Sequence, residues 1–347
     1  MSQAASHDHG RDPDRRRFLI SLAAFGASTT LPIASLAQAP AKPRLIDVHH
    51  HIIPSFFVDA WKDRGGPSFG WSPQKARAEM DQSGVATAIV SYSQPGVWLG
   101  DVQQSRSLAR RCNEYAAQLA RDDPGRFGFF AALPLPDTDG SLREIEYALG
   151  TLKADGIGLM TSYDDRWLGD TTFSPVFDEL NRRNAVVYVH PTAPACCRSL
   201  MSYVPPNLTE FTQDTNRAIT SLMFSGSLGR LTGIRFVFSH AGGTIPMLSG
   251  RIAQIIHRFQ QLAPLVPKGV EYELKRLHYE VANSATRPAI AALTSLIPIS
   301  QILFGSDYPV FPISMTAEGL SRVGLSGADV QMIERDNAIA LFPRLKT

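Results

Sequence analysis

The sequence predicts an α/β fold, a (β/α)8 TIM barrel with lid insertions over its mouth. From Lys42 onward, short β-branched or aromatic runs alternate with longer amphipathic segments, and no glycine- or serine-rich linker divides the 347-residue chain. Near-continuous apolar strands with a helix between each pair are typical of a parallel sheet covered on both faces. Histidine or aspartate residues also end several of the predicted strands, which is where a barrel carries its functional residues.

The number of predicted strands, eight, is the number such a barrel needs. They lie at residues 45–49, 86–92, 127–133, 157–161, 186–190, 234–239, 277–281 and 302–305. Segments long enough for crossover helices lie at 103–122, 141–154, 174–183, 245–261 and 287–295. We expect the longer connections at 51–80 and 193–225 to form lids. A doubly wound sheet also fits the alternation, but Gly242-Gly243 lacks a G-x-G-x-x-G context and no other glycine-rich loop opens a helix.

The first 39 residues have the features of a targeting segment. An arginine run at 15–17 precedes a Phe-Leu pair and a weakly apolar stretch that ends in an A-x-A sequence at Ala39. The pattern resembles a twin-arginine export signal, cleaved after Ala39 to leave a barrel domain at 40–347. A membrane anchor is the alternative, but the stretch contains serines, threonines and a proline and is too short to span a bilayer comfortably. We therefore expect an exported, periplasmic protein.

Composition argues against nucleic acid as a partner. A formal net charge of +2 leaves no basic surplus for a phosphate backbone, and 44% hydrophobic residues are typical of a globular chain. The cysteines are Cys112, Cys196 and Cys197, and an odd count leaves at least one thiol free. Because adjacent cysteines bridge only under strain, we expect Cys196 and Cys197 to serve packing or loop structure, with no disulfide framework.

The first strand contains the densest group of metal-ligating side chains. Strict alternation along Leu45–His51 puts Asp47, His49 and His51 on one face and Val48 and His50 on the other. Two neutral imidazoles on one strand form a pincer for a divalent metal ion that needs only one or two further ligands. The alternative is a histidine-rich patch that binds nothing.

Later strand ends supply the missing ligands. His190 ends the fifth predicted strand, His240 ends the sixth, and Asp307 follows the eighth. Parallel strands of a barrel bring their carboxyl ends to one mouth, so these side chains are expected to meet there. His257 and His278 lie in a helix-like segment and near the start of a strand, so we interpret both as structural or surface residues.

The ordered motifs resemble those of the amidohydrolase superfamily. They are D-x-H-x-H at residues 47–51, His-Pro at 190–191, Ser-His-Ala-Gly-Gly at 239–243 and Gly-Ser-Asp-Tyr-Pro at 305–309. The branch they resemble includes aminocarboxymuconate-semialdehyde decarboxylase and the γ-resorcylate, salicylate-type and 6-methylsalicylate decarboxylases. The fourth strand ends in Met160-Thr161-Ser162 without a lysine, which argues against the binuclear members that use a carbamylated lysine. The resemblance therefore implies a single metal ion.

The resemblance also implies roles for individual residues. His49, His51, His190 and Asp307 would hold one divalent ion, for which the H-x-H motif favours Zn2+, with water in the open position. His240 would be the catalytic histidine, and both it and Asp307 are candidates for the acid that protonates the substrate ring.

Two further residues receive roles outside this ligand set. Arg251 matches a substrate-carboxylate arginine of the muconate enzyme, the alternative being a solvated helix charge. We expect Asp47 to orient a ligand imidazole.

The function that these expectations favour is metal-dependent removal of CO2 from an o-hydroxy aromatic acid of the 6-methylsalicylate type. Residues 65–70 contain no arginine where the muconate enzyme has a second substrate arginine, so a monocarboxylate is favoured over a dicarboxylate. A metal-dependent hydrolase of a lactone or of a carbon–carbon bond next to a carbonyl is the alternative. A non-catalytic metal- or solute-binding protein is a third class, which His240 argues against. The resemblance further suggests a homodimer.

Overall fold

The structure is a computed structural model that describes residues 44–64, 66, 70–201 and 203–345. All of them belong to one compact unit, Lys42–Thr347. The predicted export signal at 1–39 lies outside the described residues and stays a prediction. Among the described residues, none of the helices combines the length and the apolar character that crossing a membrane requires.

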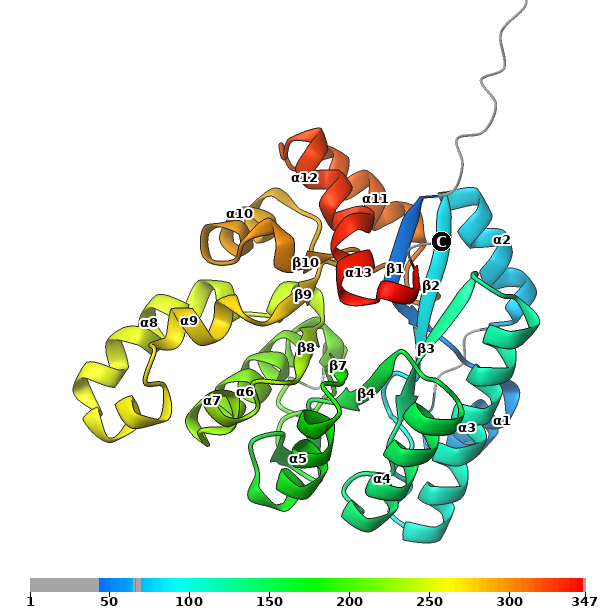
Figure 1. The fold of residues 1–347 in the computed structure, drawn as a ribbon, viewed down its shortest axis with the longest axis horizontal. Coiled ribbons are helices and arrows are strands. Elements are labelled where there is room, and N and C mark those ends of the chain that lie inside the picture. Colours follow the sequence, from blue (N-terminus) through cyan, green and yellow to red (C-terminus); the bar gives the residue numbers. More distant parts are fainter. Residues whose placement is uncertain (1–43, 65, 67–69, 202, 346–347) are drawn as a thin grey trace, which may run out of the picture. The chain divides into compact units, whose positions relative to one another are not determined.

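Eight parallel strands form the barrel that the sequence predicts (Figure 1). In their spatial order they are β1 (Leu45–His51), β2 (Val85–Ser91), β3 (Phe127–Ala132), β4 (Gly156–Met160), β7 (Val186–His190), β8 (Arg235–Phe238), β9 (His278–Glu280) and β10 (Ile302–Leu303). The chain around β10 returns to β1, because Val48 N donates to Phe304 O at 3.0 Å and His51 N donates to Tyr308 O at 2.7 Å. These bonds close the barrel and bring residues 304–308 beside the first strand.

Helices connect successive strands on the outside of the barrel. They are α1 (Ser55–Trp61), α2 (Pro73–Ser83), α3 (Val102–Asp122), α4 (Thr138–Ile145), α5 (Ser174–Arg182), α6 (Glu210–Phe224), α7 (Ser227–Arg230), α8 (Ile245–Arg258), α9 (Val270–Lys275), α10 (Arg287–Leu296), α11 (Ile313–Arg322), α12 (Gly327–Gln331) and α13 (Asn337–Leu341). Each of the five predicted crossover helices corresponds to one of these, α4 being continued by a π-helical turn at Glu146–Thr151.

Local sequence signals explain where these helices begin and end. Ser72 caps α2 by accepting a hydrogen bond from Lys75 N, with Pro73 at the first helical position, and Gly84 ends the helix in the left-handed conformation. Asp101 caps α3 in the same way through Gln104 N. Hydrophobic residues such as Met80 of α2 and Leu108 of α3 then belong to the core between helices and strands.

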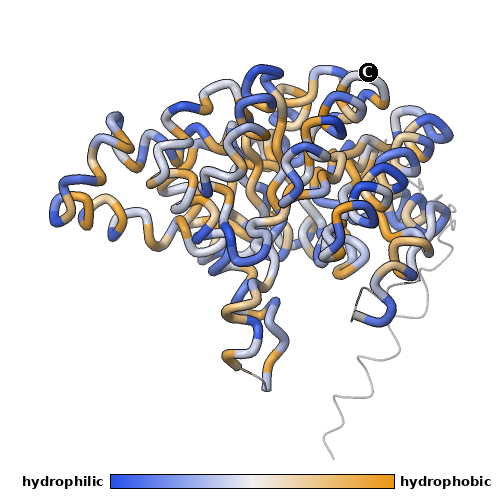
Figure 2. The backbone as a smooth tube through the Cα atoms, turned by 90° about the horizontal axis from the view of Figure 1, so that it is seen from below, coloured by the Kyte–Doolittle hydropathy of each residue, from blue (hydrophilic) through white to orange (hydrophobic). Residues whose placement is uncertain are grey.

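The core has two layers. The larger layer lies between strands and helices, and the smaller one fills the barrel with the side chains Ile46, Val48, Ile89, Phe130, Val186, Tyr188, Val237 and Leu303. Ala338 and Leu341 of α13, with Phe342 and Leu345, belong to the same inner layer. They lie at the end where strands begin, since Leu341 O accepts a hydrogen bond from Arg235 at the start of β8. In Figure 2 hydrophobic residues accordingly concentrate in the middle of the molecule, and hydrophilic residues are more frequent in the surrounding helices and loops.

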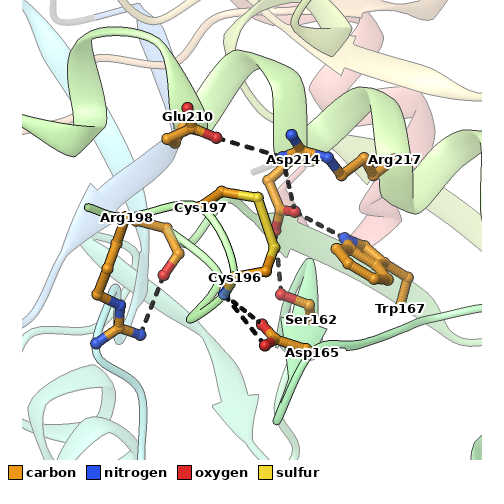
Figure 3. The surroundings of a disulfide bond; sticks show 10 residues. Ser162, Asp165, Trp167, Cys196, Cys197, Arg198, Glu210, Asp214 and Arg217 are labelled. Atoms are coloured by element: carbon orange, nitrogen blue, oxygen red, sulfur yellow. Dashed lines mark hydrogen bonds and ion pairs between the residues drawn. A yellow bond between two sulfur atoms is a disulfide. The ribbon is translucent and has the colours of Figure 1, made fainter. Parts of the chain in front are cut away.

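The connections after β4 and β7 contain two features that were not predicted from the sequence. A two-stranded antiparallel hairpin, β5 (Ser162–Tyr163) and β6 (Arg166–Trp167), follows β4. The sulfur atoms of Cys196 and Cys197 are joined in a disulfide in the turn after β7 (Figure 3). The expectation that this pair would serve only packing or loop structure is therefore corrected. In the same turn, Cys196 N donates to the Asp165 carboxylate at the tip of the hairpin at 3.1 Å. Cys112 is the buried free thiol.

Candidate metal centre and active site

Four of the predicted side chains converge at the carboxyl ends of the strands. One ligand atom each from His49, His51, His190 and Asp307 lies within 4.8 Å of the others, and all four residues are buried. His49 Nε2 is 3.2 Å from His51 Nε2, and Asp307 Oδ1 is 2.8 Å from His51 Nε2 and 3.2 Å from His49 Nε2. The structure thus brings together, from β1, β7 and the segment after β10, the set that the sequence singled out.

The donor atoms of this cluster fit a metal ion. The other ring nitrogens of two imidazoles face acceptors, since His49 Nδ1 donates to Glu280 Oε1 at 2.8 Å and His190 Nδ1 donates to Pro191 O at 2.7 Å. Both Nε2 atoms are then left with lone pairs available for a ligand bond. Ligand nitrogens about 2.0–2.1 Å from a tetrahedral zinc ion lie about 3.3 Å apart. The observed 3.2 Å between the Nε2 atoms of His49 and His51 matches this spacing.

The electrostatics of the cluster favour one positive charge between the imidazoles. Burial lowers the pKa of His49, but the carboxylates of Glu280 and Asp307 outweigh burial and raise it to about 10. Burial raises the pKa of Asp307, yet the neighbouring His49 charge and histidine hydrogen bonds hold it well below its usual range. Burial and the charges of His51 and His49 lower the pKa of His190 well below its usual range. A cation between these side chains is compatible with the raised pKa of His49 and the lowered pKa values of Asp307 and His190.

Glu280, at the end of β9, is a functional residue that the sequence analysis missed. Its fully buried carboxylate accepts hydrogen bonds from His49 Nδ1 at 2.8 Å, His240 N at 2.8 Å and Ala282 N at 2.6 Å. Burial raises the pKa of Glu280, but the adjacent His49 charge brings it below its ordinary value. The available signal was an acidic residue within the predicted strand at 277–281, because a buried carboxylate needs partners.

Asp47 has a different position from the one predicted. The pairing of β1 with β2 shifts register between Asp47 and His50, so the side chains of β1 do not alternate strictly between the two faces there. The carboxylate accepts from Ser306 Oγ at 2.6 Å and contacts the Nδ1 atom of His50, which is not in the cluster, at 3.0 Å. Asp47 therefore fixes the segment that carries Asp307, and the expectation that it would orient a ligand imidazole is wrong.

His240 reaches the cluster through an unusual backbone turn. Both His240 and Ala241 have positive φ, 53° and 57°. The turn ends at Gly243, whose φ is 63° and where a side chain would collide with the backbone of Thr212 in α6. The His240 ring lies 5.1 Å from the His49 ring between centroids, and its Nε2 is 3.6 Å from Asp307 Oδ2.

Asn283 holds the second oxygen of the aspartate. Its Nδ2 donates to Asp307 Oδ2 at 2.6 Å, while Oδ1 of the same carboxylate faces His49 and His51. Both Asn283 and Asp307 have positive φ, 55° and 64°. Each oxygen of Asp307 therefore has its own protein partner, which fixes the plane of the carboxylate.

Arg251 is not brought to the cluster by any contact. It lies on α8 with an exposed side chain and makes no hydrogen bond or ion pair with the described part of the chain. His257 is exposed on the same helix and His278 begins β9, so neither joins the cluster, as predicted. The role of Arg251 in substrate binding stays a prediction.

Comparison with known proteins places this site in a family context. The family model described as amidohydrolase matches residues 46–344. The 6-methylsalicylic acid decarboxylase of Penicillium expansum is 35% identical over 320 residues, covering 87% of this chain and 97% of that protein. The 6-methylsalicylic acid decarboxylase of Aspergillus aculeatus is 36% identical over 326 residues, covering 87% and 96%. A crystal structure of dihydroxybenzoic acid decarboxylase from Polaromonas, with manganese and 2-nitroresorcinol bound, has a TM-score of 0.76 at 22% identity, covering 88% and 98%.

Glu280→Gln is expected to weaken the affinity for a divalent ion by about 10- to 100-fold, because the amide cannot match the carboxylate that orients His49. The measurement is competition with a chelator, followed by metal analysis of the protein. Glu144→Gln is the matched control, since Glu144 is a buried carboxylate bonded to Arg110 and Asn113 away from the cluster. Unchanged affinity in Glu280→Gln would contradict the role given to this carboxylate.

Gly305→Ala is expected to lower metal content strongly without unfolding the barrel. An added Cβ would overlap the Glu280 carboxylate and lie 2.8 Å from His49 Cβ, so both side chains must move. Gly158→Ala on β4 is the control, because its Cβ would meet nothing nearer than 3.4 Å. Metal analysis with circular dichroism separates loss of the ion from loss of fold. Equal metal content in the two variants would argue against the packing described here.

Proposed function

This chain belongs to the amidohydrolase family, and on that premise we propose that it is a metal-dependent decarboxylase of an o-hydroxy aromatic acid of the 6-methylsalicylate type. The observation that carries the proposal is the buried cluster of three imidazoles and one carboxylate, with His240 beside it, at the mouth of the barrel. Relatives more than a third identical over 87% of this chain are 6-methylsalicylic acid decarboxylases, which supports the same reaction and substrate class.

In this proposal His49, His51, His190 and Asp307 hold the ion. When bound, a divalent ion supplies Lewis-acid polarisation of substrate oxygens. Zn2+ is the ion we propose, because three nitrogen donors and one oxygen donor suit it. The related dihydroxybenzoic acid decarboxylase with bound manganese makes Mn2+ the ion to compare in the same experiment.

A residue of the chain has to donate one proton to the ring carbon of the substrate. Loss of CO2 breaks the bond between the ring and the carboxyl carbon, and the electron pair left on the ring carbon must take up a proton. Both oxygens of Asp307 are already engaged, one by His49 and His51 and the other by Asn283. His240 is outside the four-atom cluster and its backbone is fixed by Glu280. We therefore propose His240 as the proton donor and Asp307 as a ligand.

Purified metal-loaded protein is expected to release CO2 from 6-methylsalicylate or salicylate, followed by loss of ultraviolet absorbance and by trapped CO2. Zn2+ and Mn2+ are added back to metal-free protein in parallel. An aromatic lactone in the same panel tests the hydrolase alternative, which predicts acid release and no CO2 from the hydroxybenzoates.

His190→Ala is expected to lose metal and activity together, because it removes a ligand.

His240→Asn is expected to keep the metal and to lose about 10²- to 10⁴-fold in kcat, because it removes the proton donor. His257→Asn, an exposed substitution on α8, is the control with wild-type activity. Full activity of His190→Ala without bound metal would refute the site.

We also propose that the protein is a homodimer. Large apolar side chains are exposed on the lid after β7 and at the start of α8, namely Leu200, Tyr203, Leu208 and Met247 at 69%, 82%, 65% and 77% exposure. Exposed apolar groups of this size are typical of surfaces that bind another protein.

Light scattering is expected to give about twice the 38.0 kDa of the full chain, or twice the mass of the processed chain. Met247→Glu is expected to weaken the dimer and Met315→Glu on α11 to leave it intact; a monomeric wild-type protein would overturn the proposal.

A further inference from the structure

We propose that Arg198, in the turn after β7, binds the carboxylate of the incoming substrate at the mouth of the barrel. This inference rests on the proposed function and names a residue that selects acids over neutral phenols.

The charge of the metal centre makes such a cation useful. Asp307 and Glu280 both contact His49, and Asp47 lies one hydrogen bond away from the backbone of the same residue. Two of these buried carboxylates already balance the charge of a divalent ion held by neutral imidazoles. An anionic substrate therefore meets a centre with little net positive charge, and a nearby guanidinium adds attraction that the centre lacks.

Arg198 is held beside the backbone that leads out of the cluster. Its Nη2 donates to Ala193 O at 3.1 Å, and Ala193 lies three residues after the predicted ligand His190. The side-chain oxygen of Gln94 fixes the same segment, accepting from Ala193 N at 2.8 Å and from Thr192 Oγ1 at 3.0 Å. Gln94 in turn follows β2, whose Ser91 pairs with His51. The segment that positions Arg198 thus follows β7, which carries His190, and is hydrogen-bonded to the loop after β2, the strand that pairs with β1.

The turn before Arg198 is also fixed. Cys196 N donates to the Asp165 carboxylate at 3.1 Å, and the disulfide joins Cys196 to Cys197. In Figure 3 the Arg198 side chain extends away from the disulfide and from Asp165, toward the Ala193 carbonyl. The guanidinium is therefore presented by a restrained turn.

Arg198 retains the donors that carboxylate recognition needs. Within the part of the chain that the structure describes, the guanidinium forms no ion pair, and its one hydrogen bond goes to a carbonyl. A guanidinium has five N–H donors in a planar fork, and two of them can meet both oxygens of a carboxylate. Arg166 of the neighbouring hairpin lies 5.8 Å above the Phe173 ring instead, and Arg217 of α6 forms an ion pair with Glu210. Arg198 is exposed, so these donors are accessible to an incoming ligand.

The test compares a ligand with a carboxylate and one without it. Arg198→Met and Arg198→Lys are prepared in the full metal-loaded protein, and the dissociation constants of salicylate and phenol are measured beside KM and kcat. Arg198→Met is expected to raise the Kd of salicylate and the KM by about 10- to 100-fold, with phenol binding and metal content unchanged. Arg198→Lys is expected to restore part of the loss, because lysine keeps the charge but not the fork.

The matched control is Arg322→Met, at an exposed arginine of α11 that forms an ion pair with Glu318, and this variant is expected to bind salicylate as the wild type does. Unchanged salicylate binding in Arg198→Met would overturn the proposal. An equal loss for salicylate and phenol, or a loss of metal, would also overturn it, because Arg198 would then only support the loop. Binding is measured without turnover, so these outcomes can be determined even if the wild-type protein releases no CO2. Absence of CO2 release would count against the proposed function alone.

Discussion

The carboxylate of Glu280 is the interaction on which the geometry of the candidate centre depends. It joins the His49 imidazole on β1, the backbone of His240 after β8 and the backbone of Ala282 after its own strand β9. These partners come from strands that are distant in sequence, so only a closed barrel brings them to one buried anion. A buried carboxylate is costly unless all its partners are present, and the barrel therefore has to form with this register for the charge to be tolerated.

A second carboxylate, Asp47, has the matching role where the barrel closes. It binds Ser306, and the segment 304–308 pairs with β1 and presents Asp307 to the imidazoles. The candidate ligands are thus held by two buried anions, one on each side of His49. Neither anion is in the four-atom ligand set, yet both decide where that set lies.

Most of the fold and four members of the centre could be predicted from the sequence. The strands were visible because apolar runs alternate with amphipathic segments, and the ligands because parallel strands bring His190 and Asp307 to the mouth that His49 and His51 occupy. What the sequence could not reveal depends on local irregularity or on tertiary partners. The register shift in β1 moved Asp47 away from the imidazole it was expected to orient. The sequence shows Glu280 only as an acidic residue in a strand, because its role depends on the groups that meet around it. Short elements such as the β5–β6 hairpin and the disulfide turn have too few residues for a periodic pattern.

Side chains of α13 fill one end of the barrel, and the order of synthesis therefore affects when the candidate metal centre can form. His49 leaves the ribosome long before Asp307, and the side chains that fill the opposite end of the barrel follow Asp307 by about thirty further residues. Neither the closing strand nor the α13 side chains that fill the end of the barrel have been synthesised when His49 and His51 leave the ribosome. A nascent chain therefore carries His49 and His51 without their later partners, and the four candidate ligands can meet only once Asp307 has been synthesised. Metal capture would accordingly act as a late checkpoint on completeness, since a chain truncated before Asp307 has no fourth ligand to offer.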